Sequence, residues 1–202
     1  MGVAERRSRE RASREIRITA AARNIAAREG WSAVTIRRLA DEIEYSQPVL
    51  YSHFANRDAI VAAVAVEGFG ELATVLRQAG ERSSDRRGAL SDVAGAYLAF
   101  ARAHPALYEA MFTMPTGLRF ADDETRPELR EAFAALMAVV ARAQDGDRDA
   151  TATETFWATL HGLAELERSA RIRPEARPER LALAVDVFLA VEVDDPTAVR
   201  AE

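Results

Sequence analysis

The feature that most constrains the fold of this chain is the spacing of its apolar residues, which is helical along almost the whole sequence. Ile18, Ala22, Ile25 and Ala26, for example, recur at i, i+4, i+7 and i+8, and therefore share one helix face. Alternation of apolar and polar residues, the strand pattern, never persists, and helix breakers fall between the periodic stretches. The sequence therefore predicts an all-α fold.

We predict about nine helices, three of which begin after residues that can cap a helix with a side-chain oxygen, namely Thr35, Ser46 and Asn56. The predicted helices cover about 9–29, 35–44, 46–54, 56–79, 89–103, 104–112, 128–143, 150–172 and 178–192. We expect the last residues, from Asp194, to fray. The organisation predicts an N-terminal domain over 1–58 and a C-terminal domain over 59–202.

Charge is distributed unevenly along the chain, whose formal net charge is −5. All basic residues are Arg, and residues 1–60 hold 11 Arg and 8 acidic residues, which gives +3. Residues 61–202 hold 16 Arg and 24 acidic residues, which gives −8. A basic end on an acidic body indicates that only this end meets a polyanion.

Several function classes have no support in the sequence. The chain contains no Cys, so disulfides and thiolate sites are excluded. The first ten residues lack an apolar signal segment, and the longest apolar run, 59–66, is too short to span a membrane. HExxH, P-loop and GxGxxG motifs are absent. We expect a cytoplasmic protein that does not contact membranes, is not an enzyme, and uses neither a metal nor a cofactor.

The segment "YSQPVLYSHF", residues 45–54, follows the short predicted helix "TIRRLADEIE" after only a few residues, as in a helix-turn-helix. Pro48 is compatible with a helix start, because the first N–H groups of a helix have no partner within it. Leu50 and Phe54 share the inward face. The outward face has no acidic residue, which favours contact with phosphates.

The residue types on this face suit duplex DNA. Gln47 can pair with an adenine edge, and Pro48 and Val49 can pack on a thymine methyl group. Hydroxyl and imidazole groups can donate to phosphates, Arg can neutralise them, and helix N-termini attract them. The predicted DNA-binding residues are Thr35, Arg37, Ser46, Gln47, Pro48, Val49, Tyr51, Ser52, His53 and Arg57. The alternative is that this three-helix unit only packs.

Residues from about 16 to 66 resemble the DNA-binding domain of the TetR family of bacterial repressors, through "REGW", "VTIRRLA", "LYSHF" and "NRDAI". The resemblance implies that Gln47, Pro48, Val49, Tyr51 and His53 match DNA-contacting positions, and that Arg57 matches a phosphate-holding position. It also implies a homodimer on a palindromic operator that responds to a small-molecule effector. One position departs from the family pattern, because Glu44 stands where the turn usually has Gly.

Large flexible apolar residues surround the long irregular segment 113–127, and they can form either a core or an adaptable pocket. "HPALYEAMF" and "FWATLHGLAELE" resemble a TetR subfamily named for its Trp–His–Gly motif. The candidate effector-pocket residues are Phe100, Tyr108, Met111, Phe112, Met114, Phe120, Phe133, Met137, Trp157 and His161. Their character predicts an apolar or aromatic effector.

The last two predicted helices carry apolar stripes, which by resemblance form the dimer interface as an isologous four-helix contact. The candidate dimer residues are Leu160, Leu163, Leu181, Val185 and Phe188. The preferred function is a ligand-responsive homodimeric repressor. The alternative is an all-α ligand-binding or enzymatic protein with an incidental basic N-terminus.

Overall fold

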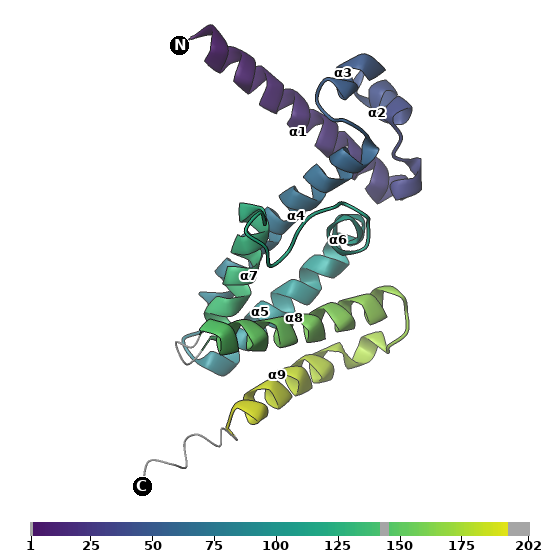
Figure 1. Ribbon diagram of the computed structural model, residues 1–202. Helices are drawn as coiled ribbons and strands as arrows, with labels where there is room; N and C mark the ends of the chain where they lie inside the picture. The colour runs from purple at the N-terminus through teal and green to yellow at the C-terminus, as the bar shows by residue number, and fades with distance from the viewer. Residues whose placement is uncertain (1, 142–145, 194–202) are drawn as a thin grey trace. The chain divides into compact units, whose positions relative to one another are not determined.

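A computed structural model describes residues 2–141 and 146–193, and within these ranges the chain is all-helical, as predicted (Figure 1). The helices in these ranges are nine α-helices and two 3-10 helices. They are α1 (Val3–Glu29), η1 (Trp31–Ala33), α2 (Ile36–Ile43), α3 (Gln47–Tyr51), α4 (Arg57–Gly80), α5 (Arg86–Ala103), α6 (Pro105–Phe112), α7 (Pro127–Val140), α8 (Gly146–Arg168), η2 (Pro174–Ala176) and α9 (Arg177–Val193). The predicted end of the helix at 142–143 and the predicted frayed tail lie outside the described residues.

Local signals explain where several helices begin and end. The Thr35 hydroxyl accepts from the Arg38 N–H at 3.1 Å, and the Asn56 side chain accepts from the Ala59 N–H at 2.8 Å, so both predicted caps are confirmed. Gly30 ends α1 at a φ of 81°, where its N–H donates to the Ala26 carbonyl at 2.9 Å. Only glycine adopts such a backbone readily. Helix α1 begins six residues earlier than the predicted start at 9.

The chain divides into two compact units. One comprises residues 1–70 and 104–129, and the other comprises 71–103 and 130–202, so α4 contributes residues to both. Helix α6 and the segment after it therefore belong with the N-terminal helices, and α4 runs without a break through the predicted boundary at 58/59.

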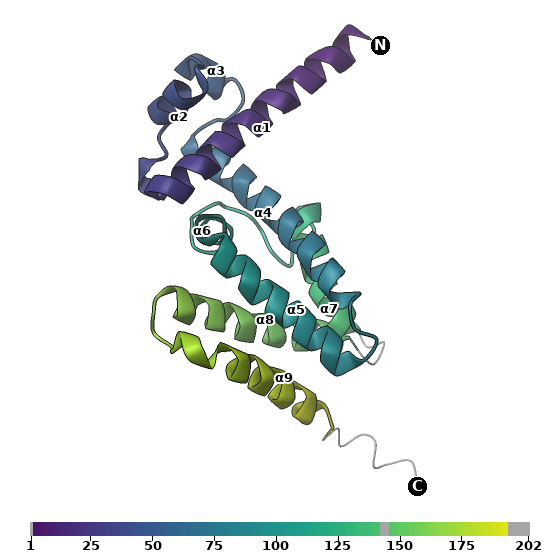
Figure 2. The ribbon, with the colours of Figure 1, turned by 180° about the vertical axis from the view of Figure 1, so that it is seen from behind.

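In the first unit, α1 packs against η1, α2 and α6, and α2 packs against α3 (Figure 2). Ile18 and Ile25 of α1, Leu39 of α2 and Leu50 of α3 are completely buried. The buried Trp31 indole donates to the Ala106 carbonyl at 2.7 Å and so joins η1 to α6. This core fixes the short helices α2 and α3, which are too short to be stable alone.

In the second unit, α5 packs against α8 and α9. Tyr97, Phe156 and Leu160 form part of its buried core, and the Phe156 and Phe188 rings lie 4.9 Å apart. The Arg86 guanidinium donates to the Val140 carbonyl at 2.9 Å and so satisfies the C-terminal end of α7.

Helix α4 is long and apolar enough to cross a membrane by length and composition, with a mean hydropathy of 1.8 over an 18-residue window. Half of that window is buried inside the structure. Its buried members include Ile60, Val64 and Phe69, so its apolar surface serves as core in this structure.

Candidate nucleic-acid interface

Helix α3 is a five-residue helix held at its start by backbone geometry and at its centre by one buried side chain. Ser46 is the N-cap residue with extended backbone, and its carbonyl accepts from the Val49 N–H at 3.0 Å. Its hydroxyl makes no capping bond, contrary to our prediction that the Ser46 side chain caps the helix. Pro48 lies in the first turn as predicted, and Leu50 is completely buried.

Most of the predicted DNA-binding side chains of this unit are accessible to a partner. Tyr51 is 54% exposed, although its side chain is large and aromatic. Val49 is half-buried, and the Ser52 hydroxyl donates to the Val49 carbonyl at 2.7 Å. The exposed members of the predicted set are Thr35, Arg37, Ser46, Gln47, Pro48, Tyr51 and Ser52. The acid-free outer face predicted for α3 is therefore a solvent-facing surface.

His53 lies elsewhere than we predicted. Its side chain is only 5% exposed, and its Nδ1 lies 3.3 Å from Glu15 Oε1 of α1. The same carboxylate oxygen accepts from Arg11 Nε at 2.9 Å. The ring thus faces α1 and not solvent, so it does not present a donor to a phosphate, and we remove it from the candidate surface.

Arg57 also makes contacts that we did not predict. Its Nε donates to the Val34 carbonyl and its Nη2 to the Trp31 carbonyl, both at 2.7 Å. The remaining Nη1 lies 3.4 Å from the Asp58 carboxylate. The guanidinium therefore joins the first turn of α4 to the segment before α2, and only 31% of the side chain is exposed.

The turn between α2 and α3 has the geometry that a glycine would adopt, although the residue is Glu44. Its φ of 57° and ψ of 38° lie in the left-handed region. The Glu44 N–H donates to the Ala40 carbonyl, and the Tyr45 N–H donates to the same oxygen at 3.0 Å. Helix α2 therefore ends at Ile43, one residue before its predicted end.

Ion pairs hold α1 and α2 together beside this turn. Arg28 donates to Glu42 at 3.0 Å, and Arg38 of α2 donates to Glu29 of α1 at 3.1 Å. The hydrogen bond to Glu42 raises the pKa of Arg28 above its usual value. Because these groups are exposed, the pairs contribute little to stability, and their effect is to orient the two helices.

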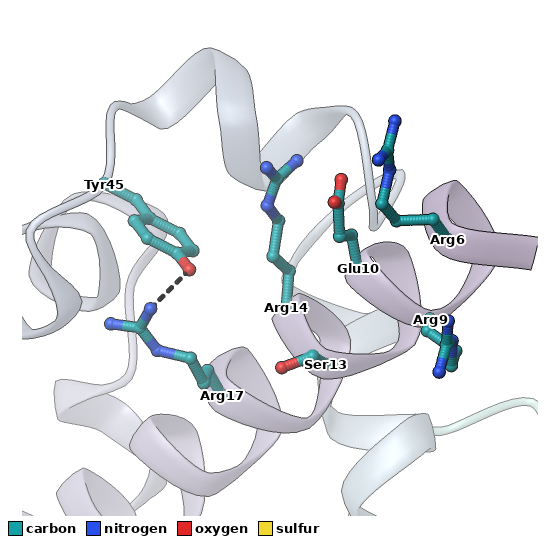
Figure 3. Close-up of a pocket in the computed structure, with 7 residues that line it drawn as sticks. All are labelled: Arg6, Arg9, Glu10, Ser13, Arg14, Arg17 and Tyr45. Carbon is teal, nitrogen blue, oxygen red and sulfur yellow. Dashed lines mark hydrogen bonds between the residues drawn. The ribbon is translucent and has the colours of Figure 1, made fainter. Parts of the chain in front are cut away.

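A basic groove on the N-terminal half of α1 was not predicted. Arg6, Arg14 and Arg17 line it together with Tyr45, the residue just before Ser46 (Figure 3). Arg17 Nη1 donates to the Tyr45 hydroxyl at 2.8 Å, and the guanidinium carbon lies 4.9 Å from the Tyr45 ring centre. The signal available in the sequence was the helical spacing of these Arg residues, of which Arg6 lies upstream of the predicted helix start.

The ten candidate effector-pocket residues are divided between the two units. Those in the first unit belong to an aromatic cluster around Phe69, whose ring lies 5.3 Å from Phe112 and 5.6 Å from Phe120. The Tyr108 and Phe112 rings lie 4.6 Å apart. Tyr108 and Met111 are buried, Phe112 and Met114 are half-buried, and Phe120 is 44% exposed.

In the second unit, Phe100 is buried, whereas Phe133, Met137, Trp157 and His161 are half-buried. The Trp157 indole donates to the Tyr97 hydroxyl at 3.0 Å, which joins α8 to α5. Burial lowers the pKa of His161, an effect that Glu165 opposes and Arg168 reinforces. A Cβ at Gly162 would meet nothing within 4 Å, so no described part of this chain approaches that glycine closely.

The candidate dimer residues need a correction. Leu160 is completely buried and Val185 is 1% exposed within one chain, so neither can contact a second chain. Leu163, Leu181 and Phe188 are half-buried. The large exposed apolar residues on α8 and α9 are Leu166, Leu183 and Val187.

Comparison with known proteins agrees with this architecture. The profile described as "Bacterial regulatory proteins, tetR family" matches residues 18–64, which include α2 and α3. The profile described as "Tetracyclin repressor-like, C-terminal domain" matches residues 90–188, which include Trp157, His161 and Gly162.

Individual relatives extend the same likeness. An uncharacterized HTH-type transcriptional regulator of Mycobacterium tuberculosis is 34% identical over 141 residues, which are 69% of this chain and 63% of that protein, less than two thirds of its length. A structure of a protein of unknown function from Rhodococcus sp. RHA1 matches with a TM-score of 0.70 and 26% identity, over 88% of this chain and 94% of that one. A TetR variant from Acinetobacter baumannii, solved with minocycline, shares the fold with a TM-score of 0.63 and 21% identity, over 86% of this chain and 93% of that one. The chain belongs to the TetR family of bacterial regulatory proteins.

Proposed function

We propose that this protein is a homodimeric, ligand-responsive transcriptional repressor that binds a palindromic operator through α3. The observation that carries the proposal is the solvent-facing, acid-free surface of Gln47, Pro48, Tyr51 and Ser52, held on a helix whose Leu50 is completely buried. A helix so anchored presents its first residues to the major groove, where side-chain amides and apolar groups distinguish base pairs. Thr35 and Arg37 at the start of α2 would contact the flanking phosphates.

Gln47 is the residue that we assign to base reading. We expect Gln47→Ala to lose discrimination at one base pair per half-site, by about 1–3 kcal/mol, with little change for unrelated sequences. Gln78→Ala, also on an exposed helix position, is the matched control. The measurement is fluorescence anisotropy with duplexes taken from the DNA that flanks the protein's own gene. An equal loss of affinity on all sequences would contradict the base-reading role.

The proposed dimer would form through the exposed apolar residues Leu166, Leu183 and Val187 of α8 and α9. Two copies of such a face would make an isologous contact and place two α3 helices on two half-sites. We expect Leu183→Glu to shift the protein to a monomer in sedimentation equilibrium. An unchanged dimer would assign the interface elsewhere.

The proposed effector is an apolar or aromatic small molecule. The aromatic cluster of Phe69, Phe112 and Phe120, next to the flexible Met111, has the composition of an adaptable apolar site. The A. baumannii relative was solved with minocycline, a ligand of that protein. Release of DNA would follow if the effector binds more tightly to a conformation that does not fit the operator.

The rival function, an all-α ligand-binding or enzymatic protein with a basic end, predicts no specific duplex binding. A log K against log[salt] slope near −0.9 for each phosphate contacted, together with preference for one palindrome, would favour the regulator. Absence of binding to the flanking DNA at low salt and without added ligand would reject the regulator function. A cytoplasmic location follows from the proposed function.

A further inference from the structure

Within the described residues, the N-terminal part of α1 is exposed to solvent. Residues 4–14 are exposed throughout, and Ile18 is the first completely buried residue of the helix. A helical segment shorter than about 12–15 residues is marginal in water when nothing packs on it. A surface of this kind contributes little to the fold, so its residues are available for a partner.

One face of this extension forms half of an open groove of about 420 Å³. Arg6, Glu10, Ser13, Arg14 and Arg17 follow each other at i, i+4, i+7, i+8 and i+11 and so share this face. In Figure 3, Arg6 and Arg14 extend on the same side of α1 as Glu10, whereas Arg9 points the other way. The other side of the groove is the Tyr45 ring.

The charge of this lining selects an anion. Without Arg9, which points the other way, the lining holds Arg6, Arg14, Arg17 and Glu10, which gives a formal charge of +2. Within the described residues, neither the Arg6 nor the Arg14 guanidinium has a hydrogen-bond acceptor or a carboxylate partner. Like charges one helical turn or two apart repel each other, and a row of phosphates would remove that repulsion.

Tyr45 joins this groove to the proposed DNA-reading surface. The hydrogen bond and the ring contact from Arg17 hold Tyr45 against α1. Tyr45 directly precedes Ser46, the N-cap residue of α3. The groove therefore ends where the proposed reading helix begins, and one continuous polyanion can follow both.

We propose that this groove binds the phosphate backbone of duplex DNA as a second contact, independent of base sequence, in addition to α3. The inference rests on the proposed function for the identity of the polyanion. Arg6 and Arg14 would neutralise phosphates, and Arg17 would be oriented by Tyr45. Glu10 would weaken the contact, because its carboxylate lies among the guanidinium groups.

The test compares the double variant Arg6→Gln/Arg14→Gln with the full-length wild type on two duplexes of equal length, one from the DNA flanking the gene and one with its sequence shuffled. We expect affinity to fall on both duplexes by the same factor, and the salt slope to fall by about 0.9 for each lost phosphate contact. Arg82→Gln/Arg130→Gln removes the same charge from exposed positions of the other unit and serves as the matched control. Circular dichroism checks that all variants remain folded.

Removal of a negative charge from the groove provides a second test, with an expected effect of opposite sign. Glu10→Gln should raise affinity on both duplexes and steepen the salt slope, because it removes the only carboxylate in the lining. An Arg6→Gln/Arg14→Gln variant that matches the control in affinity and slope would overturn the proposal. If wild type binds both duplexes alike and only the α1 variants weaken binding, operator recognition fails and the groove contact stands. Binding of neither duplex by wild type would overturn both.

Discussion

Glu44 lies in a backbone conformation that its side chain disfavours, and its replacement by glycine gives a sharp test of the described turn. At a φ of 57°, the Cβ of an L-residue crowds the following carbonyl, at a cost of about 1–2 kcal/mol. Glu44 is exposed, and within the described residues its carboxylate makes no hydrogen bond that would offset this cost. Glu44→Gly removes the strain and leaves both backbone bonds to the Ala40 carbonyl in place.

The gain is smaller than the strain, because glycine also increases the entropy of the unfolded chain by about 0.5–1 kcal/mol. The expected net increase in the free energy of unfolding is therefore about 0.5–1 kcal/mol. For a chain of this size, 1 kcal/mol corresponds to a rise of about 2–4 °C in Tm, which calorimetry resolves.

Two further variants separate backbone strain from other effects of the Glu44 side chain. Glu44→Ala removes the carboxylate and keeps the positive φ, so we expect stability near that of wild type. Ala170 has a φ of 53° in the other unit, and Ala170→Gly should give a similar gain there. Equal stability of Glu44→Ala and Glu44→Gly, or no gain for glycine, would refute the reasoning and show that the turn avoids the left-handed region.

Three further predictions follow from single contacts. Because burial lowers the pKa of His161, the unfolded state binds more protons than the folded state near the ordinary pKa of 6.5. The free energy of unfolding should therefore fall as the pH decreases through this region. In a series of urea-unfolding experiments from about pH 8 to 5, His161→Gln should make this part of the pH dependence flatter. Arg57→Lys keeps the charge but not the fork that binds two carbonyls, so it should lower Tm as Arg57→Ala does; a Tm restored by Lys would contradict the contact. A Cβ at Gly68 would lie 2.7 Å from Met111 Sδ, whereas a Cβ at Gly70 would meet only Glu128, at 3.9 Å. Gly70→Ala should therefore raise Tm, and Gly68→Ala should not. Equal gains in Tm would show that α4 and α6 are not in close contact at Gly68.

The features that were predicted correctly from the sequence are those that depend on residues close together in the chain. The helices, the caps at Thr35 and Asn56, and the position of Pro48 in the first turn of α3 all follow from local chemistry. The start of α1 was predicted late, because the segment from Val3 to Ser8 has no apolar stripe to mark a helix.

The errors concern contacts between distant segments. His53 faces Glu15, which is 38 positions away, and an imidazole on a short helix gives no sign of that partner. An apolar stripe shows that a helix face is covered but not by what, so Leu160 and Val185 were assigned to a second chain although their own chain buries them. The two carbonyl acceptors of Arg57 were not predicted either, because a backbone carbonyl has no side-chain signature.

The bonds around η1 have an evolutionary consequence. Arg57 donates to the carbonyls of Trp31 and Val34, and the Trp31 indole donates to the carbonyl of Ala106. Every residue type supplies a backbone carbonyl, so substitutions at Val34 and Ala106 that the packing accommodates leave these acceptors intact. Two donor side chains thus hold α4, α6 and the start of α2 together, and the accepting positions can change in sequence without losing these bonds. A lineage can therefore change these accepting residues while the frame that positions the proposed DNA-reading helix persists.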